Sequence, residues 1–224
     1  FANSIRDKIP MDKLRKVIVF FTSSMGDCEL PIPAQFAAAR ILLTLVDQLF
    51  NKSSNRAKKW PPAAPGGNPS DGSDILRDIL RATIEKFSSL MLFIPNVIAL
   101  VKKELHGEEG IGNCDCLSQL VSSGSKTGIP LADLLIEGVR EIRSLIRTLL
   151  LTSKMTIHCL THRVSSRMLT KSDVSLIDSL LEDSLKCAHL FSVAAGLVQS
   201  AGFEKSISSS ANGGGRFGSA EELA

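Results

Sequence analysis

The stretch Pro33–Phe50, PAQFAAARILLTLVDQLF, decides the fold class of this 224-residue chain. Its apolar residues recur at spacings of three and four along one face, and they are Phe36, Ala39, Leu42, Leu43, Leu45, Val46, Leu49 and Phe50. This period predicts a helix with one broad apolar face. Such a face must be buried against other helices, so the stretch indicates an all-α packing module.

The same period recurs outward from this helix in both directions. It divides the chain into a helical pair (1–51), a Pro/Gly-rich loop (52–73), a helical stretch kinked at Pro95 (74–105), a flexible loop (106–130), a helical repeat (131–201), a Gly/Ser-rich linker (202–220) and the start of a further helix (221–224). Proline inside a helix removes a backbone hydrogen bond, so Pro95 is expected to kink or split the third of these ranges.

Within 131–201 we expect three helices. The first, Leu131–Leu151, has a sharp apolar stripe, made of Leu135, Val139, Ile142, Ile146 and Leu149. A shorter helix follows around Lys154–Leu169. Ser172 then offers a cap for a long helix. The stripe expected on that helix is Ile177, Leu181, Leu185, Ala188, Phe191 and Ala195.

No pair of these helices could bury its apolar faces alone. The pattern therefore predicts antiparallel helix pairs separated by long disordered loops, stacked as an α-solenoid or closed into a bundle. No tight sequence repeat decides between the two.

Composition narrows the function classes. The chain has 26 Lys and Arg and 23 Asp and Glu, so its net charge is only +3. A charge this close to balance does not indicate nucleic acid or an anionic membrane as a partner. Five cysteines without framework spacing favour a reducing, intracellular compartment. Charges interrupt the longest apolar runs, so we expect no membrane span. The chain opens on Phe1 rather than Met, and we expect a piece of a longer protein.

The residue types that could carry chemistry do not form a convincing site. His158 and His162, four apart on a helix, could share a zinc ion with Cys114 and Cys116, but the C-x-C pair lacks the usual spacing. Surface histidines and free thiols are the simpler interpretation. A thiol nucleophile at Cys159 or Cys187 lacks an aimed base, and Cys187 is better explained as a small core residue. We expect no cofactor and no enzyme activity.

Two features are candidates for protein interaction. Arg140, Arg143 and Arg147 form a basic row, but Glu137 and Glu141 are interleaved with them, as on ordinary solvated helices. Without basic–aromatic interleaving, contact with nucleic acid is expected to be indirect at most. Trp60, beside Pro61, either anchors its loop or contacts a partner.

Several stretches, taken in order, resemble one family. They are FANSIRD (1–7), PIPAQFAAARILLTLVDQL (31–49), ILRDILRATIEKF (75–87), LADLLIEGVREIRSLIRTLL (131–150), DVSLIDSLLEDSLKCAHLFSV (173–193) and SAEELA (219–224). They are similar to the transformation/transcription domain-associated proteins (TRRAP and its fungal counterparts). In that family a Leu-rich helix ending in Leu-Val-Asp precedes a polar insert and a helix ending near Lys-Phe, here Leu45-Val46-Asp47 and Glu85-Lys86-Phe87.

The resemblance implies a segment of HEAT-type α-solenoid in a very large nuclear scaffold. That family is related to phosphatidylinositol-3-kinase-like kinases without kinase activity, and it belongs to SAGA-like histone acetyltransferase co-activator complexes. The resemblance also implies that the segment docks other subunits and acidic transcriptional activators. Acidic partners would suit the basic row Arg140, Arg143 and Arg147. The resemblance implies no membrane partner.

Two other classes of function remain open. A stand-alone cytoplasmic helical adaptor or tether would fold by itself. A small metal-dependent or thiol enzyme would carry stoichiometric zinc or a reactive cysteine.

Overall fold

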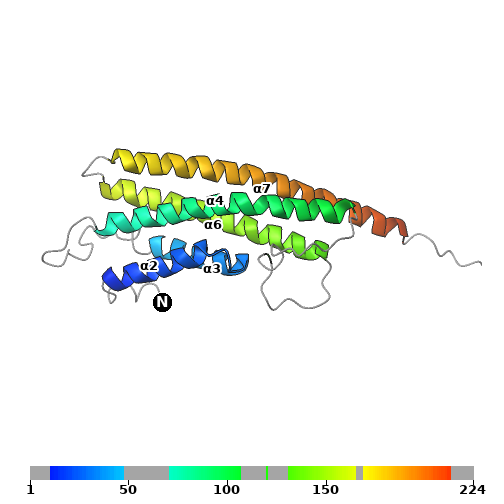
Figure 1. The fold of residues 1–224 in the computed structure, drawn as a ribbon, viewed down its shortest axis with the longest axis horizontal. Coiled ribbons are helices and arrows are strands. Elements are labelled where there is room, and N and C mark those ends of the chain that lie inside the picture. Colours follow the sequence, from blue (N-terminus) through cyan, green and yellow to red (C-terminus); the bar gives the residue numbers. More distant parts are fainter. Residues whose placement is uncertain (1–10, 48–70, 107–119, 121–130, 165–168, 213–224) are drawn as a thin grey trace, which may run out of the picture.

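The computed structural model describes residues 11–47, 71–106, 120, 131–164 and 169–212. The helices in these ranges are α2 (Met11–Gly26), α3 (Ile32–Val46), α4 (Asp71–His106), α6 (Leu131–Val164) and α7 (Lys171–Asn212) (Figure 1). The described part of the chain contains no strand, and the all-α prediction is confirmed.

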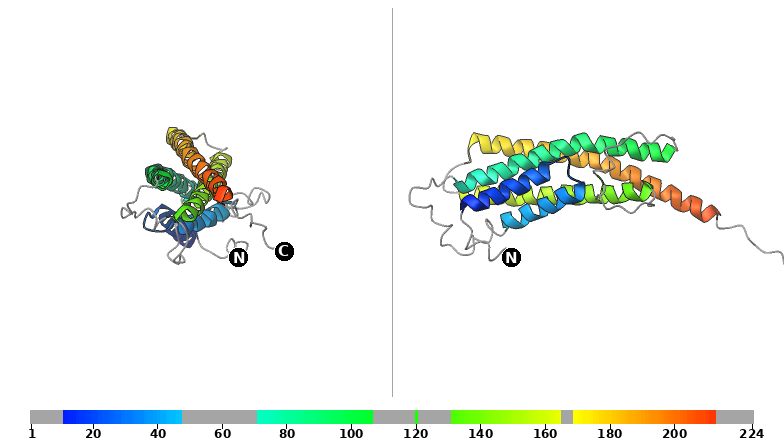
Figure 2. Two further views of the ribbon diagram at one scale, coloured as in Figure 1. Left: turned by 90° about the vertical axis from the view of Figure 1, so that its right-hand side faces the viewer. Right: turned by 60° about the horizontal axis from the view of Figure 1, so that its bottom comes forward.

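The helices lie in two layers. One layer contains α2, α4 and α7, each packed on the next, and the other contains α3 packed on α6. The end-on view in Figure 2 shows α2, α4 and α7 following one another around one side of the molecule, with α3 and α6 on the other. The two layers also contact each other, because α2 packs on α3, α4 on α6, and α6 on α7.

Polar contacts fix the directions of the helices in the first layer. Arg15 of α2 pairs with Asp78 of α4 at 3.8 Å, and Cys28 just after α2 contacts Ser89 of α4 at 3.2 Å. The second contact lies further along the sequence than the first in both segments, so α2 and α4 are parallel. Arg77–Asp173 and Ser88–Asp183 show the same for α4 and α7.

This order is the packing of an α-solenoid. Each helix of the first layer is followed in the chain by its antiparallel partner in the second layer, as α2 is by α3 and α4 is by α6. The next helix then returns to the first layer. The solenoid rather than the closed bundle is therefore the observed fold.

The first pair is much shorter than the helices that follow. At 1.5 Å per residue, the 16 residues of α2 and the 15 of α3 give lengths of about 24 and about 22 Å, whereas the 36 residues of α4 give about 54 Å. Figure 1 shows α2 and α3 beside only the first half of α4. The second half of α4 and the first half of α6 extend beyond them.

The buried faces of α3 and α6 arise from their apolar periodicity. All five residues predicted to face inward on α6 are buried, and Arg140, Arg143 and Arg147 are exposed. On α3 the buried set is Ile32, Gln35, Ala38, Ala39, Leu42, Leu45 and Val46. Phe36 and Leu43 are half-buried, and Leu49 and Phe50 lie outside the described residues.

The helix α4 continues through Pro95 to His106 instead of splitting there. Pro95 itself is exposed, while Ile94 and Val97 beside it are buried, so packing holds both sides of the proline in one helix. By length and composition Ser73–Lys103 could cross a membrane, contrary to the expectation of short apolar runs. The reason is that no charged residue lies between Phe87 and Val101.

The stripe predicted for α7 is partly wrong. Leu181 and Leu185 are 58% and 73% exposed, whereas Leu180, Cys187 and Ala194 are buried. Apolar residues lie around most of this helix, so its sequence does not select one face. The packing of α7 on α4 and α6 determines which face is buried.

Several predicted boundaries also differ from the structure. The helices expected at 131–151 and 154–169 are one helix, α6, because no breaker residue separates them. The last helix is capped by Thr170 rather than Ser172, and it continues to Asn212 through residues predicted as linker.

Leu120, inside the predicted loop, is buried against Gly138 of α6. The other residues of the two predicted loops that lie in 52–70, 107–119 and 121–130 are outside the described residues, as are 213–224.

Candidate functional site

A groove of about 320 Å³ lies where the turn between α2 and α3 meets the middle of α4. It is lined by Cys28, Ile32, Gln35, Lys86, Ser89, Leu90, Leu92, Phe93 and Asn96. The turn is built by proline and by an aspartate. Pro31 begins α3 and its carbonyl accepts from the Ala34 and Gln35 amides, while Asp27 Oδ1 accepts from the Glu29 amide at 2.9 Å.

Gln35 connects this turn to the groove. Its Nε2 donates to the carbonyl oxygens of Asp27 and Leu30, at 3.0 and 2.6 Å. Two carbonyl acceptors require the NH₂ end of the amide, so the orientation of the side chain is determined. Gln35 is only 1% exposed, and its Oε1 has no hydrogen-bond partner among the described residues.

Lys86 provides the positive charge of the groove. Its side chain is 2% exposed, and in the described part of the chain it makes no hydrogen bond or ion pair. Burial lowers the pKa of Lys86, and its electrostatic interactions with Cys28 and Asp27 counter part of that shift. A buried ammonium without a partner is costly, because it has lost its hydration without gaining an acceptor.

The groove combines polar and apolar lining residues. Lys86 is the cation among its lining residues, Gln35 Oε1 is buried behind its wall, and Leu90, Leu92 and Phe93 form its apolar side. Cys28 contacts Ser89 Oγ. No described histidine lines the groove, and therefore no base is aimed at the thiol.

The sequence contains a signal for Lys86. Lys86 lies seven residues after Ile79 and four before Leu90, inside the buried stripe of its helix. A cation at a core position of a helix is a reason to expect a special environment. Gln35 likewise lies within the buried stripe of α3, three residues before Ala38.

Of the residues predicted for protein interaction, the three arginines are on one exposed face of α6. None of them forms an ion pair with a residue that the structure describes, and Glu137 and Glu141 therefore do not neutralise them directly. The row lies on a different helix from the groove and does not line it. Trp60 is outside the described residues.

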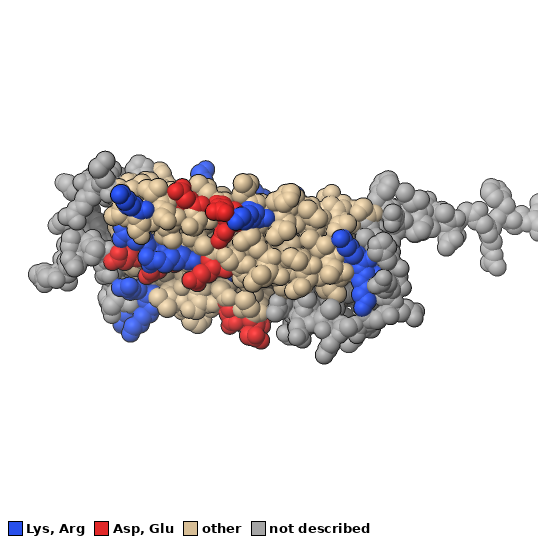
Figure 3. Space-filling view, turned by 45° about the horizontal axis from the view of Figure 1, so that its top comes forward, with Lys and Arg blue, Asp and Glu red and all other residues tan. Residues whose placement is uncertain are grey.

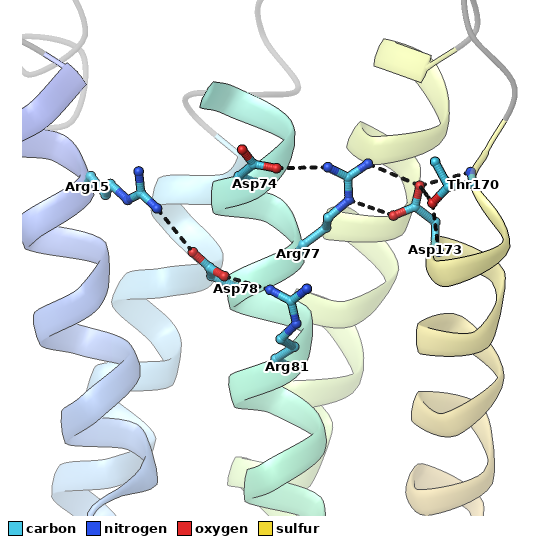
Figure 4. Close-up of polar contacts among 7 residues, drawn as sticks. All are labelled: Arg15, Asp74, Arg77, Asp78, Arg81, Thr170 and Asp173. Atoms are coloured by element: carbon cyan, nitrogen blue, oxygen red, sulfur yellow. Dashed lines mark hydrogen bonds and ion pairs between the residues drawn. The ribbon is translucent and has the colours of Figure 1, made fainter. Parts of the chain in front are cut away.

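A polar network joins the first turns of α4 and α7 (Figure 4). Arg77 donates through Nε to Asp173 Oδ1 at 2.6 Å and through Nη2 to Oδ2 at 3.1 Å, and it also binds Asp74 at 2.9 Å. Asp173 Oδ2 accepts from the Thr170 amide and hydroxyl, and the Asp173 amide donates to the Thr170 hydroxyl. This is a reciprocal N-cap, and it ties the start of α7 to α4.

The metal and thiol hypotheses find no site in the described residues. Cys114 and Cys116 lie outside them, the side chain of His162 is not described, and His158 is exposed. Across the described ranges no three His, Cys, Asp or Glu side chains are grouped to hold a metal ion. Cys159 and Cys187 are buried, and burial raises the pKa of Cys187 to about 12, which keeps that thiol protonated.

Charge is unevenly distributed over the α4–α7 side of the molecule. Figure 3 shows acidic and basic residues gathered over one end, a broad uncharged area beyond them, and further basic residues at the opposite end. The sequence explains this, since α7 has no Lys, Arg, Asp or Glu between Cys187 and Phe203, as α4 has none between Phe87 and Val101. The exposed large apolar residues of these two helices are Leu92, Val174, Leu181, Leu185 and Val193.

Comparison with known proteins adds to this geometry. The family model that describes the Tra1 HEAT repeat central region matches residues 1–213. The chain is 23% identical over 151 residues to the probable transcription-associated protein 1 of Dictyostelium discoideum. That alignment covers 66% of this chain but 3% of the relative, so the chain spans a small part of that protein's length. No solved structure matches the chain significantly.

These matches confirm the resemblance found in the helical stretches of the sequence. They also explain the two-layer packing, since paired helices stacked in this way are the unit of HEAT repeats. Because the family model covers nearly the whole chain, the chain belongs to the Tra1 family and corresponds to its HEAT repeat central region.

Proposed function

We propose that this chain is a non-catalytic scaffold segment of a transcription-associated protein, acting in the nucleus. The observation that carries the proposal is the stacked two-layer solenoid, in which long helices expose extended faces and a groove. Solenoids of this kind present extended surfaces for protein partners. The relatedness to a probable transcription-associated protein supports the cellular context.

The scaffold docks other subunits of a SAGA-like histone acetyltransferase complex, together with acidic transcriptional activators. Support comes from the exposed row Arg140, Arg143 and Arg147, which is not neutralised by described acidic residues. Such a row attracts acidic segments and guides their approach. Nucleic acid and membranes are not among the proposed partners.

Affinity purification of the intact endogenous protein, followed by mass spectrometry, tests the proposal. Acetyltransferase, deubiquitinase-module and chromatin-reader subunits should be recovered from nuclear extract. A protein in which Arg140, Arg143 and Arg147 are all replaced by alanine should lose acidic activators while keeping the subunits. The matched control replaces Lys13 and Lys16, two exposed cations of α2, and should behave as wild type.

Recovery of only cytoskeletal or membrane-tether proteins would contradict the proposal. It would favour the alternative of a cytoplasmic helical adaptor, which uses the same kind of surface. If the triple arginine variant still bound every activator, the arginine row would not be the activator-binding surface. The proposal that the chain is a scaffold segment would not be affected.

A further inference from the structure

We propose that Cys28, in the groove between the α2–α3 turn and α4, is a site of oxidation by hydrogen peroxide, and that Lys86 and Ser89 hold the resulting sulfenate. The oxidised sulfur stays on the chain, so this is a modification of the protein and not a catalytic cycle. The modification does not depend on the proposed scaffold function, because it requires only the residues of the groove.

Cys28 differs from the other described cysteines in its exposure. It is a free, exposed thiol in the turn that follows α2, and it lines the groove. Cys159 and Cys187 are also free thiols, but both are buried. Oxidation of a thiol requires access from solvent, so peroxide is expected to reach Cys28 and not the buried pair.

The second observation is a buried cation in the same groove. Lys86 is 2% exposed, lines the groove with Cys28, and makes no hydrogen bond or ion pair in the described part of the chain. Burial lowers its pKa, while electrostatic interactions with Cys28 and, less strongly, Asp27 raise it. Asp27 Oδ1 already accepts from the Glu29 amide at 2.9 Å. Cys28 is therefore the side chain best placed to supply the acceptor that Lys86 lacks.

Ser89 holds the thiol on the side of α4 that carries Lys86. Cys28 Sγ lies 3.2 Å from Ser89 Oγ. Lys86 and Ser89 are three residues apart in α4, a spacing that puts two side chains next to each other on one helix face. An oxygen atom added to the Cys28 sulfur would therefore have two donors beside it, the Ser89 hydroxyl and the Lys86 ammonium.

The oxidation itself is a two-electron transfer from sulfur to peroxide. The Cys28 sulfur attacks one oxygen of hydrogen peroxide, so that an S–O bond forms and the O–O bond breaks. The leaving hydroxide takes up the thiol proton and becomes water. Negative charge develops on that hydroxide during the step, and the charge of Lys86 stabilises it. The sulfenic acid then releases its proton to solvent and remains beside Lys86 as a sulfenate.

The unpaired cation favours this product over other modifications of the thiol. A sulfenate is an anion, and it gives Lys86 a charge-assisted hydrogen bond. A mixed disulfide or a thioether is neutral at sulfur, and it would leave the buried ammonium without a charged acceptor. The groove therefore distinguishes peroxide from thiol-exchange and alkylating reagents by the charge of what each leaves behind.

Peroxide treatment of the intact protein that carries this chain tests the proposal. After brief exposure the peroxide is removed, the protein is unfolded, every remaining thiol is alkylated, and mass spectrometry of the peptides gives the rate of oxidation at each cysteine. Cys28 should be oxidised at least about tenfold faster than Cys159 or Cys187. Dimedone present during the exposure should trap the sulfenic form at Cys28.

Lys86→Met is the decisive variant, because it keeps a side chain of similar length and removes the charge. Loss of one charge-assisted contact should slow the oxidation of Cys28 about tenfold. Lys86→Arg keeps the charge and should retain most of the rate. Lys102→Met, which alters an exposed lysine of the same helix, should leave the rate unchanged.

Ser89→Ala is the second variant, and it keeps the test decisive if Lys86→Met does not fold. Ser89 is only half-buried, and its replacement removes the hydroxyl beside the sulfur. The oxidation of Cys28 should then slow at least about threefold, the effect of one neutral hydrogen bond.

Three results would overturn the proposal. They are oxidation of Cys28 no faster than that of the buried cysteines, an unchanged rate in Lys86→Met, and, where that variant does not fold, an unchanged rate in Ser89→Ala. Each result concerns only the chemistry of the groove. Recovery of nuclear subunits with the intact protein is measured separately, so failure of this site is distinguishable from failure of the scaffold role.

Discussion

Asp173 combines a helix cap and an ion pair in one side chain. Its Oδ2 accepts from both the amide and the hydroxyl of Thr170, and both carboxylate oxygens bind Arg77. The side chain is 1% exposed, so these contacts replace water almost completely. The pKa of Asp173 is lowered from 3.8 to about 2, first by the hydrogen bond from Arg77 and then by those from Thr170, against the opposing effect of burial.

This shift predicts a dependence of stability on acid. The folded-state pKa lies below the unfolded value, so the stabilising contribution is complete above pH 3.8 and is lost as the pH falls through about 2. We expect Asp173→Asn to lower the free energy of unfolding by about 2 kcal/mol at neutral pH, with the gap to wild type closing in that acidic range. Urea denaturation at a series of pH values measures it.

Asp178, exposed on the same helix, provides the control for this experiment. Asp178→Asn should change the free energy of unfolding by less than about 0.5 kcal/mol at every pH. A gap between wild type and Asp173→Asn that stays constant down to pH 2 would show that the contacts of Asp173 do not depend on its charge.

Single residues were the scale at which the sequence was least informative. Lys86 and Gln35 are residue types that usually lie at the surface, and their burial depends on the α2–α3 turn coming against α4. Their positions in the apolar stripes were visible in the sequence. Their missing partners were not, because partners across a groove are set by tertiary packing.

At the scale of elements, the clarity of the stripe decided how well each helix could be predicted. In α6 the residues facing solvent are charged, so Leu135, Ile142 and Leu149 could be assigned to the core correctly. In α7 leucines lie on opposite faces, and a leucine in solvent resembles one in the core. The observed choice, Leu180 rather than Leu181, comes from α4 and α6.

This choice predicts unequal effects of neighbouring substitutions in α7. Leu180→Ala removes a buried side chain and should lower the free energy of unfolding by about 2–5 kcal/mol. Leu181→Ala and Leu185→Ala should each change it by less than about 0.5 kcal/mol, because both side chains are exposed. Chemical denaturation of the three variants measures these changes. A larger loss of unfolding free energy for Leu181→Ala than for Leu180→Ala would mean that the face predicted from the sequence is the buried one.

Two helical glycines, Gly138 of α6 and Gly196 of α7, offer a second comparison between elements. A Cβ atom on Gly196 would meet nothing within 4 Å, whereas one on Gly138 would lie 2.8 Å from Leu120 Cδ2. Gly196→Ala should stabilise the chain by about 0.5–1 kcal/mol through helix propensity. Gly138→Ala must displace Leu120 and should be about 1–3 kcal/mol less stable than Gly196→Ala.

Thermal and urea unfolding of both glycine variants measure this difference. Equal stabilisation by the two substitutions would mean that Leu120 moves aside without loss, and that its burial against α6 contributes little.

At the scale of the whole molecule, the sequence predicted stacked helices but not their order in space. Each apolar face required a neighbour, and either a bundle or a solenoid could supply one. The deciding contacts join residues far apart in the chain, such as Arg77 with Asp173, and no local pattern predicts that pairing. The family resemblance favoured the solenoid before the contacts were known, and those contacts agree with it.

The uneven distribution of polar contacts between α4 and α7 has a mechanical consequence. Among the described residues, Arg77–Asp173 and Ser88–Asp183 connect the first halves of these helices, and the later halves meet through apolar side chains. Directional bonds resist sliding, whereas apolar surfaces permit small shear movements. We therefore expect the pair to resist sliding where these polar contacts lie, and to accommodate a load along the solenoid by small shifts between the uncharged stretches of α4 and α7.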